Sequence, residues 1–285
     1  MTHSPAFVIF AILMGRPILM LLMLLTAVIS GCQTAPEHPV LPPLKIQTAT
    51  LEELTAKINR QSEAIRSVKT TLDIRVRDRS MEGSRECQGL LAHEKPDKLY
   101  LKGYRPLIPT FFTIVARENT FWVHIPKENR VLTGKVSDLN GSEGLSMGIR
   151  PDDLMRALNI QPVPPSETHI VEMQESPLQY ILFVFRKMGD EKILERQIFV
   201  ERYFLNVERE VFYNAYGVAE LDIARKDYTP DEATPFPQEI IIFRPDRGST
   251  LFLRANKLRV NPVLRNDLFD FQMPGGATIE ELKND

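Results

Sequence analysis

Residues 68–77 read Val-Lys-Thr-Thr-Leu-Asp-Ile-Arg-Val-Arg, with apolar residues at nearly every second position. Alternation of this kind is typical of a β-strand that buries one face and exposes the other. The residues before it follow a different period, because apolar side chains recur at helical spacing from Leu51 to Val68. Thr50 and Glu53 form the pattern of a capping box, which marks a helix start. The change of period predicts a helix followed at once by the first strand of a sheet.

Strand patterns continue almost to the C-terminus, separated by short stretches that contain Pro, Gly, Asn or Asp. This spacing is typical of hairpins in an antiparallel meander. A helical insert at 135–163 interrupts it, with a short helix at 151–158 that has Pro at its first turn and acids directly after it. The charged runs at 208–210 and 225–227 are expected to be exposed. About a dozen strands are predicted: the one at 68–77 and Arg85–His93, Lys98–Tyr104, Phe111–Arg117, Thr120–Ile125, Arg130–Gly134, Thr168–Met173, Tyr180–Arg186, Arg196–Phe204, Glu208–Tyr213, Gly217–Tyr228, Gln238–Phe243 and Thr250–Val260.

An apolar run precedes this domain and ends at Cys32. Residues 25–32 read Leu-Thr-Ala-Val-Ile-Ser-Gly-Cys and resemble a bacterial lipobox, which implies removal of residues 1–31 as a signal peptide and acylation of Cys32. A transmembrane helix is the alternative. The uncharged run at 17–30 covers only 14 residues, whereas a bilayer core requires about 20. Extending it upstream would place Arg16 in the membrane, so we expect a signal peptide that starts at Met1 or Met14.

Residues 33–48 contain four prolines and are expected to form an extended tether. The chain is therefore divided into a signal peptide (1–31), a lipidated cysteine with its tether (32–48) and a folded domain (49–285). In lipoproteins generally, an Asp directly after the lipidated cysteine marks retention in the inner membrane. Because Gln33 occupies this position, we expect the mature protein to be anchored to the outer membrane and to face the periplasm.

The composition argues against several classes of function. A formal net charge of −2 leaves no basic field that would attract nucleic acid. The five histidines are scattered, without the spacing of metal ligands. Residues 141–144, Gly-Ser-Glu-Gly, lack the strand and helix that flank a nucleophile elbow. Cys87 lies in a predicted strand and is expected to be a buried thiol. We expect a monomer without enzymatic activity, metal or cofactor.

The C-terminal residues complete a pattern that resembles a known family. Residues 269–276 read Phe-Asp-Phe-Gln-Met-Pro-Gly-Gly, followed by β-branched residues and a predicted short helix. Together with the first helix, the long meander, a central hairpin at 125–134 and the insert at 135–163, this order of features resembles the LolA/LolB superfamily over residues 50–282. Proteins of that superfamily carry lipoproteins across the periplasm and receive them at the outer membrane. The resemblance implies a mainly β, α+β fold: an unclosed antiparallel β half-barrel of about 11–12 strands, with an N-terminal helix and a short helical lid.

In this superfamily the concave face of the half-barrel holds acyl chains under the lid. Strands that line such a cavity are expected to be apolar on both faces, as are residues 111–116, 180–185 and 240–243. Central strands of a covered sheet would show the same pattern. The sequence does not identify the buried arginine that latches the lid in some members, since Arg75 and Arg77 are expected on a solvated face. The candidate cavity residues are Phe112, Ile114, Trp122, Leu154, Leu182, Val184 and Ile241.

Residues 104–110 read Tyr-Arg-Pro-Leu-Ile-Pro-Thr, so that two prolines flank Leu107 and Ile108. Neither residue is expected in a regular ladder, which predicts a stiff loop with an apolar tip. By position, the resemblance implies that this tip helps to insert acyl chains into the membrane. The alternative is that the pair folds back onto one end of the barrel as part of the core.

These features predict an outer-membrane lipoprotein that binds a lipid, or the acyl chains of lipoproteins, in a hydrophobic cavity and assists their transfer or insertion. The alternative function is that of an interaction scaffold, an envelope sensor or an assembly factor, which would have the same fold with a filled interior. The space left open on the concave face discriminates between the two functions.

Overall fold

The computed structural model describes residues 45–79, 82–136 and 150–282. They belong to one compact unit with its own core. No helix within these ranges is long and apolar enough to cross a membrane. Cys32, Gln33 and nearly all of the predicted tether lie outside the described residues.

In the part of the chain that the structure describes, the strands are accompanied by the helices α2 (Leu51–Ala64) and α3 (Pro151–Leu158) and the 3₁₀ turns η1 (Pro126–Glu128) and η3 (Asn266–Phe269). The strands are β1 (Ser67–Arg77), β2 (Arg85–Glu94), β3 (Lys98–Arg105), β4 (Ile108–Arg117), β5 (Thr120–Ile125), β6 (Arg130–Lys135), β7 (His169–Glu175), β8 (Gln179–Met188), β9 (Glu191–Glu201), β10 (Val207–Tyr213), β11 (Ala219–Tyr228), β12 (Pro237–Arg244), β13 (Ser249–Ala255), β14 (Arg259–Val260) and β15 (Thr278–Glu281).

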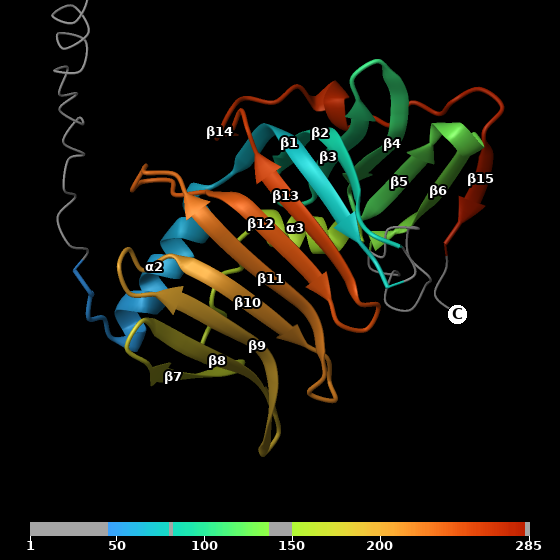
Figure 1. Cartoon of the computed structure of the whole chain (residues 1–285). Coiled ribbons are helices and arrows are strands. Elements are labelled where there is room, and N and C mark those ends of the chain that lie inside the picture. Colours follow the sequence, from blue (N-terminus) through green and yellow to red (C-terminus); the bar gives the residue numbers. More distant parts are fainter. Residues whose placement is uncertain (1–44, 80–81, 137–149, 283–285) are drawn as a thin grey trace, which may run out of the picture. The chain divides into compact units, whose positions relative to one another are not determined.

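All of these strands form one curved sheet (Figure 1). Its order is β15-β6-β5-β4-β3-β2-β1-β13-β12-β11-β10-β9-β8-β7, and β14 pairs with β1 beside this path. The sheet consists of two antiparallel meanders, β1–β6 and β7–β13, which join where β1 pairs with β13. Among the strands of the described residues, only β15 and β6 pair in parallel. The predicted fold class, a mainly β, unclosed antiparallel half-barrel with an N-terminal helix and a short helical insert, is confirmed.

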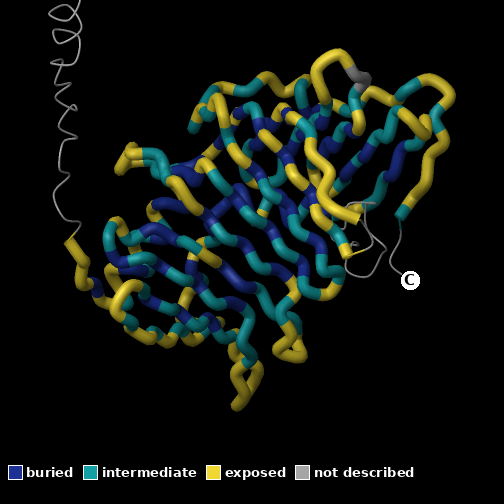
Figure 2. The backbone as a smooth tube through the Cα atoms, viewed as in Figure 1, coloured by how far each residue is buried: buried dark blue, intermediate teal, exposed yellow. Residues whose placement is uncertain are grey.

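The alternating pattern in β1 places its apolar side chains on the inner face, where Leu72 and Ile74 are buried. Figure 2 shows the same alternation of buried and half-buried residues along the other strands. The predicted capping box of α2 is also present. The backbone N–H of Glu53 donates to Thr50 Oγ1 over 3.2 Å, and the N–H of Thr50 donates to Glu53 Oε2 over 2.8 Å. The helix ends at Ala64, before the end of the apolar stripe, because Ile65 is already extended.

The last element differs from the expectation. Residues 278–281 were predicted to lead into a short helix, but they form β15 alongside β6. The backbone N–H of Thr278 donates to the carbonyl oxygen of Asn129 over 2.9 Å. Strand β6 ends its meander and leaves backbone groups open on one side, and pairing with β15 satisfies them. The prediction of a terminal helix was therefore wrong.

Candidate functional site

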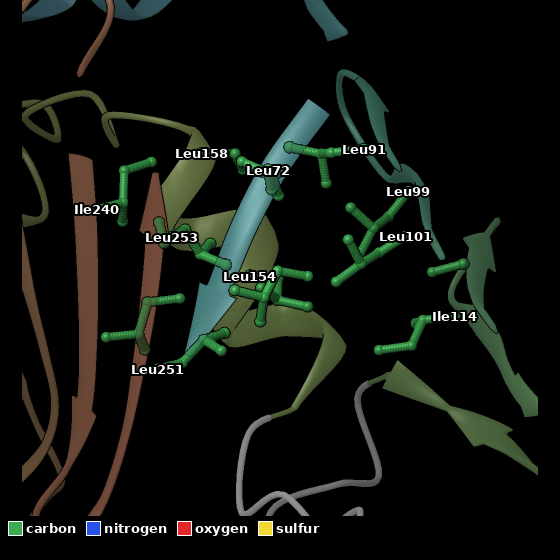
Figure 3. Packing of buried hydrophobic residues seen from close by; sticks show 14 of the residues in the cluster. Leu72, Leu91, Leu99, Leu101, Ile114, Leu154, Leu158, Ile240, Leu251 and Leu253 are labelled. Atoms are coloured by element: carbon green, nitrogen blue, oxygen red, sulfur yellow. The ribbon is translucent and has the colours of Figure 1, made fainter. Parts of the chain in front are cut away.

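Helix α3 lies on the concave face of the sheet. Leu154, Ala157 and Leu158 are buried in a cluster with side chains from both meanders, including Leu72 of β1 and Leu253 of β13. Figure 3 shows Leu154 and Leu158 pointing among the labelled leucines and isoleucines of the strands. The apolar face of α3 thus fills this part of the half-barrel.

The N-terminal end of α3 is held by Asp153. One of its carboxylate oxygens accepts a hydrogen bond from the backbone N–H of Arg150 over 3.0 Å, which caps the helix. Arg244 Nη1 of β12 lies 2.9 Å from the other oxygen. Burial, followed by the neighbouring Asp152, raises the pKa of Asp153 to about 6, although Arg244 acts in the opposite direction.

The C-terminal end of α3 is held by Arg225 of β11. Its guanidinium donates to the carbonyl oxygens of Ala157 over 3.2 Å, Arg156 over 3.1 Å and Asn159 over 3.4 Å. Carbonyl groups at the end of a helix lack partners within the helix and carry partial negative charge. The Arg225 side chain therefore satisfies and neutralises this end of α3.

A second arginine shares the counter-charge of Arg225. Glu210 of β10 is fully buried, and its Oε2 lies 2.7 Å from Arg225 Nη1. Arg196 of β9 donates to Glu210 Oε1 over 3.2 Å, and also to the carbonyl oxygens of Gln161 and Pro162 over 3.2 and 2.8 Å. The three charges connect the chain after α3 to three neighbouring strands. We call Arg196, Glu210 and Arg225 the buried triad.

The expectation that the runs at 208–210 and 225–227 are exposed is wrong for Glu210 and Arg225, which are 0% and 1% exposed. Arg225 continues the period-2 series of Leu221 and Ile223, both buried. This alternation was the available signal for its inward orientation. Arg75 does lie on a solvated face, as predicted, and pairs with Glu86 there.

His93 holds the residue that follows α3. Its Nε2 lies 3.0 Å from Asn159 Oδ1, and its Nδ1 lies 2.8 Å from the carbonyl oxygen of Lys98. Burial lowers the pKa of His93. Both ring nitrogens face polar groups, and the ring as a whole is buried, so this side chain is a structural histidine of the core.

The candidate cavity residues divide between the two faces of the sheet. Five of them lie in the buried clusters: Phe112, Ile114 and Leu154 with α3, and Leu182 and Val184 in the cluster beneath α2. The other two lie on the opposite face. Trp122 alternates in sequence with the buried Phe121 and Val123, and its ring stacks on that of Phe271 with centroids 5.7 Å apart. Ile241 borders a groove of the outer face.

The predicted apolar tip is a tight turn between β3 and β4. Leu107 is fully exposed and has a φ of 64°. Pro106 followed by a residue with positive φ is the pattern of a type II turn, which favours glycine at the second position. Ile108 pairs with Arg105 and begins β4, so the expectation that it lies outside the ladder was wrong. The turn leaves the Leu107 side chain exposed.

Comparison with known proteins gives a result only at the level of structure, since no family model and no curated protein matches the sequence. Solved structures do match: 76% of this chain aligns with 97% of a LolA superfamily protein from Nitrosomonas europaea, with a TM-score of 0.51 and 12% identity. The fold is LolA-like. A domain described as an outer-membrane lipoprotein-sorting protein from Vibrio parahaemolyticus aligns over 76% of this chain and 95% of its own, with a TM-score of 0.51 and 12% identity.

A DUF1329 family protein from Desulfovibrio piger gives a TM-score of 0.54 at 12% identity, over 78% of this chain and 98% of its own. The structural similarity to the LolA superfamily protein agrees with the resemblance seen in the sequence. At this identity it concerns the fold alone. Within the described ranges, no group of three or more His, Cys, Asp or Glu side chains is placed to hold a metal ion.

Proposed function

We propose that this protein is an outer-membrane lipoprotein that binds a lipid, or the acyl chains of a lipoprotein, on the concave face of its sheet beneath α3. It assists the transfer or insertion of that ligand at the outer membrane, as a monomer and without catalysis. The position of α3 carries the proposal. An eight-residue helix covers the apolar centre of the half-barrel and is held at both ends by charged side chains.

This arrangement suits the exchange of α3 for an acyl chain. Withdrawing α3 uncovers Leu72, Ile114 and Leu253, an aliphatic surface that water solvates poorly and an acyl chain covers well. When α3 withdraws, Arg225 loses its contacts with the helix carbonyl groups but keeps its counter-charge, because Glu210 lies on the neighbouring strand. The exchange replaces one apolar contact with another and leaves the rest of the sheet in place.

Two further features support the role at a membrane. The lipobox-like sequence ending at Cys32 provides an acyl anchor, and Gln33 favours the outer membrane. The exposed Leu107 provides an apolar tip on a rigid turn. Burying one such side chain in lipid contributes about 1.5–3 kcal/mol, which is enough to aid transfer but too little to anchor the protein.

The test is binding of a fluorescent fatty acid to the full chain and to an Arg225→Lys variant. Lysine keeps the charge opposite Glu210 but cannot reproduce the fork that reaches three carbonyl oxygens. We expect the wild type to bind the probe and the variant to bind it several-fold more tightly, because α3 is held less firmly. The matched control is Arg209→Lys, an exposed position on the neighbouring strand, which should bind like wild type.

One observation favours a second function, that of an interaction scaffold, envelope sensor or assembly factor. The apolar side chains of α3 and the sheet are packed in contact, and the hollows that the described residues form nearby are lined by charged groups. Two results together would show that the carrier proposal is wrong: neither the wild type nor Arg225→Lys takes up the probe, and mass spectrometry finds no apolar molecule in the purified full chain. They would favour the function of an interaction scaffold, envelope sensor or assembly factor.

A further inference from the structure

Six arginine side chains border one pocket of about 1040 Å³ beside α3. Three acidic residues, Glu195, Glu220 and Asp246, share its lining, so the charged lining carries a net +3 before His169 is counted. The whole chain has a net charge of −2. Positive charge is therefore gathered at this place against the overall balance. The arginines are Arg150, Arg156, Arg186, Arg196, Arg244 and Arg247.

The fold brings these arginines together from distant parts of the sequence. Arg156 lies on α3 and Arg150 directly precedes it, while the others come from β8, β9, β12 and the turn that follows β12. The hairpins β8–β9, β10–β11 and β12–β13 turn at the same end of the sheet, which is the lower end in Figure 1. The pocket lies where these hairpins meet the end of the concave face.

Five of the six arginines have an acidic partner among the described residues, including Arg247, whose Nε lies 3.8 Å from Asp246 Oδ2. Arg196 and Arg244 pair with Glu210 and Asp153, and Arg186 lies 2.9 Å from Glu195. Arg156 is 3.9 Å from Asp152 and has 47% of its side chain exposed. Its guanidinium also lies over the ring of Phe212, 5.3 Å from the centroid.

Arg150 gives the clearest evidence of a positive side chain whose hydrogen-bonding groups are not all satisfied. It is 8% exposed, and its Nε has no hydrogen-bond partner among the described residues. Burial, together with the nearby Arg244 and Arg247, lowers the pKa of Arg150, although Asp152 and Asp153 act in the opposite direction. An anion in the pocket would relieve this crowding of like charges.

We infer that this pocket binds the phosphate group of an anionic lipid headgroup. Planar guanidinium groups bind phosphate oxygens with paired hydrogen bonds. A bare phosphate would leave most of about 1040 Å³ empty, whereas this volume suits a small organic ligand. The hairpin tips beside the pocket carry the exposed apolar residues Met188, Tyr216 and Val218, which fit the lipid part of such a ligand. The inference goes beyond the proposed function: the headgroup would bind while α3 is in place, since Arg150 and Arg156 line the pocket, whereas the acyl chain would enter when α3 withdraws.

The test is calorimetric titration of the full chain in non-ionic detergent at low salt. Dihexanoyl phosphatidylglycerol is compared with dihexanoyl phosphatidylcholine and with inorganic phosphate. We expect the anionic lipid to bind at least tenfold more tightly than the zwitterionic lipid and than free phosphate. Arg156→Gln combined with Arg247→Gln should weaken binding of phosphatidylglycerol at least tenfold. The control, Arg259→Gln with Arg265→Gln, removes the same charge from exposed positions and should change it less than twofold.

Three outcomes overturn the inference: no binding of phosphatidylglycerol, an equal loss in the control variant, or equally tight binding of inorganic phosphate, which would assign the pocket to the free anion. The fatty-acid probe is measured on the same samples. If the Arg156→Gln, Arg247→Gln variant loses headgroup binding but still binds the fatty-acid probe, the pocket is supported as a separate site. If the protein binds the headgroup but never takes up the fatty-acid probe, the proposed function is wrong and the inference about the pocket is retained.

Discussion

The two ends of α3 are both held by charged side chains, but in different surroundings. At the N-terminal end, Asp153 pairs with Arg244, which also lies 3.2 Å from the half-exposed Asp246. At the C-terminal end, Arg225 and Glu210 are almost completely buried and pair with each other, and Arg225 also donates to backbone carbonyl groups. The arginine pocket is lined by Arg244 at the first end and by Arg156 and Arg196 near the second, whereas Arg225 and Glu210 lie within the core.

The N-terminal contact contains Asp153, the group whose pKa is raised by burial. Asp153 has a pKa of about 6, so the N-terminal contact changes its charge within a physiological range. The buried triad has two arginines around one carboxylate. Loss of that carboxylate would leave both arginine charges buried without a counter-charge. We therefore expect the C-terminal end to determine stability and the N-terminal end to respond to conditions.

The largest effect is expected from Glu210→Gln. This change leaves Arg196 and Arg225 buried without a counter-charge, and removing one partner of a buried pair costs about 3–5 kcal/mol. The free energy of unfolding should fall by that amount in urea denaturation at pH 7. The matched control is Asp222→Asn, which breaks the exposed pair with Arg209 on the same two strands and should cost at most about 1 kcal/mol. Equal losses in the two variants would show that the buried triad does not hold α3.

The next effect concerns Asp153 and pH. Its pKa is raised from 3.8 to about 6, so the folded protein holds this proton more tightly than the unfolded chain. The resulting stabilisation is fully present below pH 3.8 and is lost as the pH rises through about 6, which corresponds to about 3 kcal/mol. From pH 4 to pH 7, wild type should lose most of that stability, about 2.5 kcal/mol, relative to Asp153→Asn, measured by denaturation at each pH. Parallel stability curves for the two proteins would contradict this pKa.

His93 should give a smaller effect of the opposite sign. Burial lowers the pKa of His93, so the unfolded chain takes up a proton below its ordinary value of 6.5 while the folded protein does not. The stability that the neutral form contributes is present above pH 6.5 and is lost as the pH falls. His93→Gln should cost about 1 kcal/mol at pH 7 through a lost hydrogen bond, and its stability should fall less steeply than that of wild type below pH 6.5. An unchanged slope would argue against this assignment.

The smallest effect on stability is expected at Leu107, which is remote from both ends of α3. Because its side chain is fully exposed, Leu107→Glu should change the free energy of unfolding by no more than about 0.5 kcal/mol. The same variant should deliver a fluorescent acylated ligand to vesicles more slowly than wild type. Leu178→Glu, another exposed leucine at a turn, serves as the control and should deliver it normally. A large loss of stability would show that the turn is packed in solution.

Local sequence patterns predicted much of the fold because they act through neighbouring residues. The strand Thr120–Ile125 was predicted with the bounds that it has in the structure, and the capping box starts α2 at Leu51. Hairpin turns and alternating side chains depend on residues only a few positions apart, so they can be recognised in one sequence. The bounds of β9 were less well predicted, because its first residues, beginning at Glu191, are charged.

The sequence by itself determined the class of fold, most of the strand segments along the chain and the inner face of β1. Only the tertiary structure decided that Glu210 and Arg225 are buried and that α3 is held by them. A charged residue in an alternating strand fits either face, because burial of a charge is tolerated when a partner compensates it and is costly otherwise. The partners of Arg225 include the carbonyl oxygen of Ala157, 68 positions away. Such a contact exists only after the second meander has folded against the helix, and no local pattern records it.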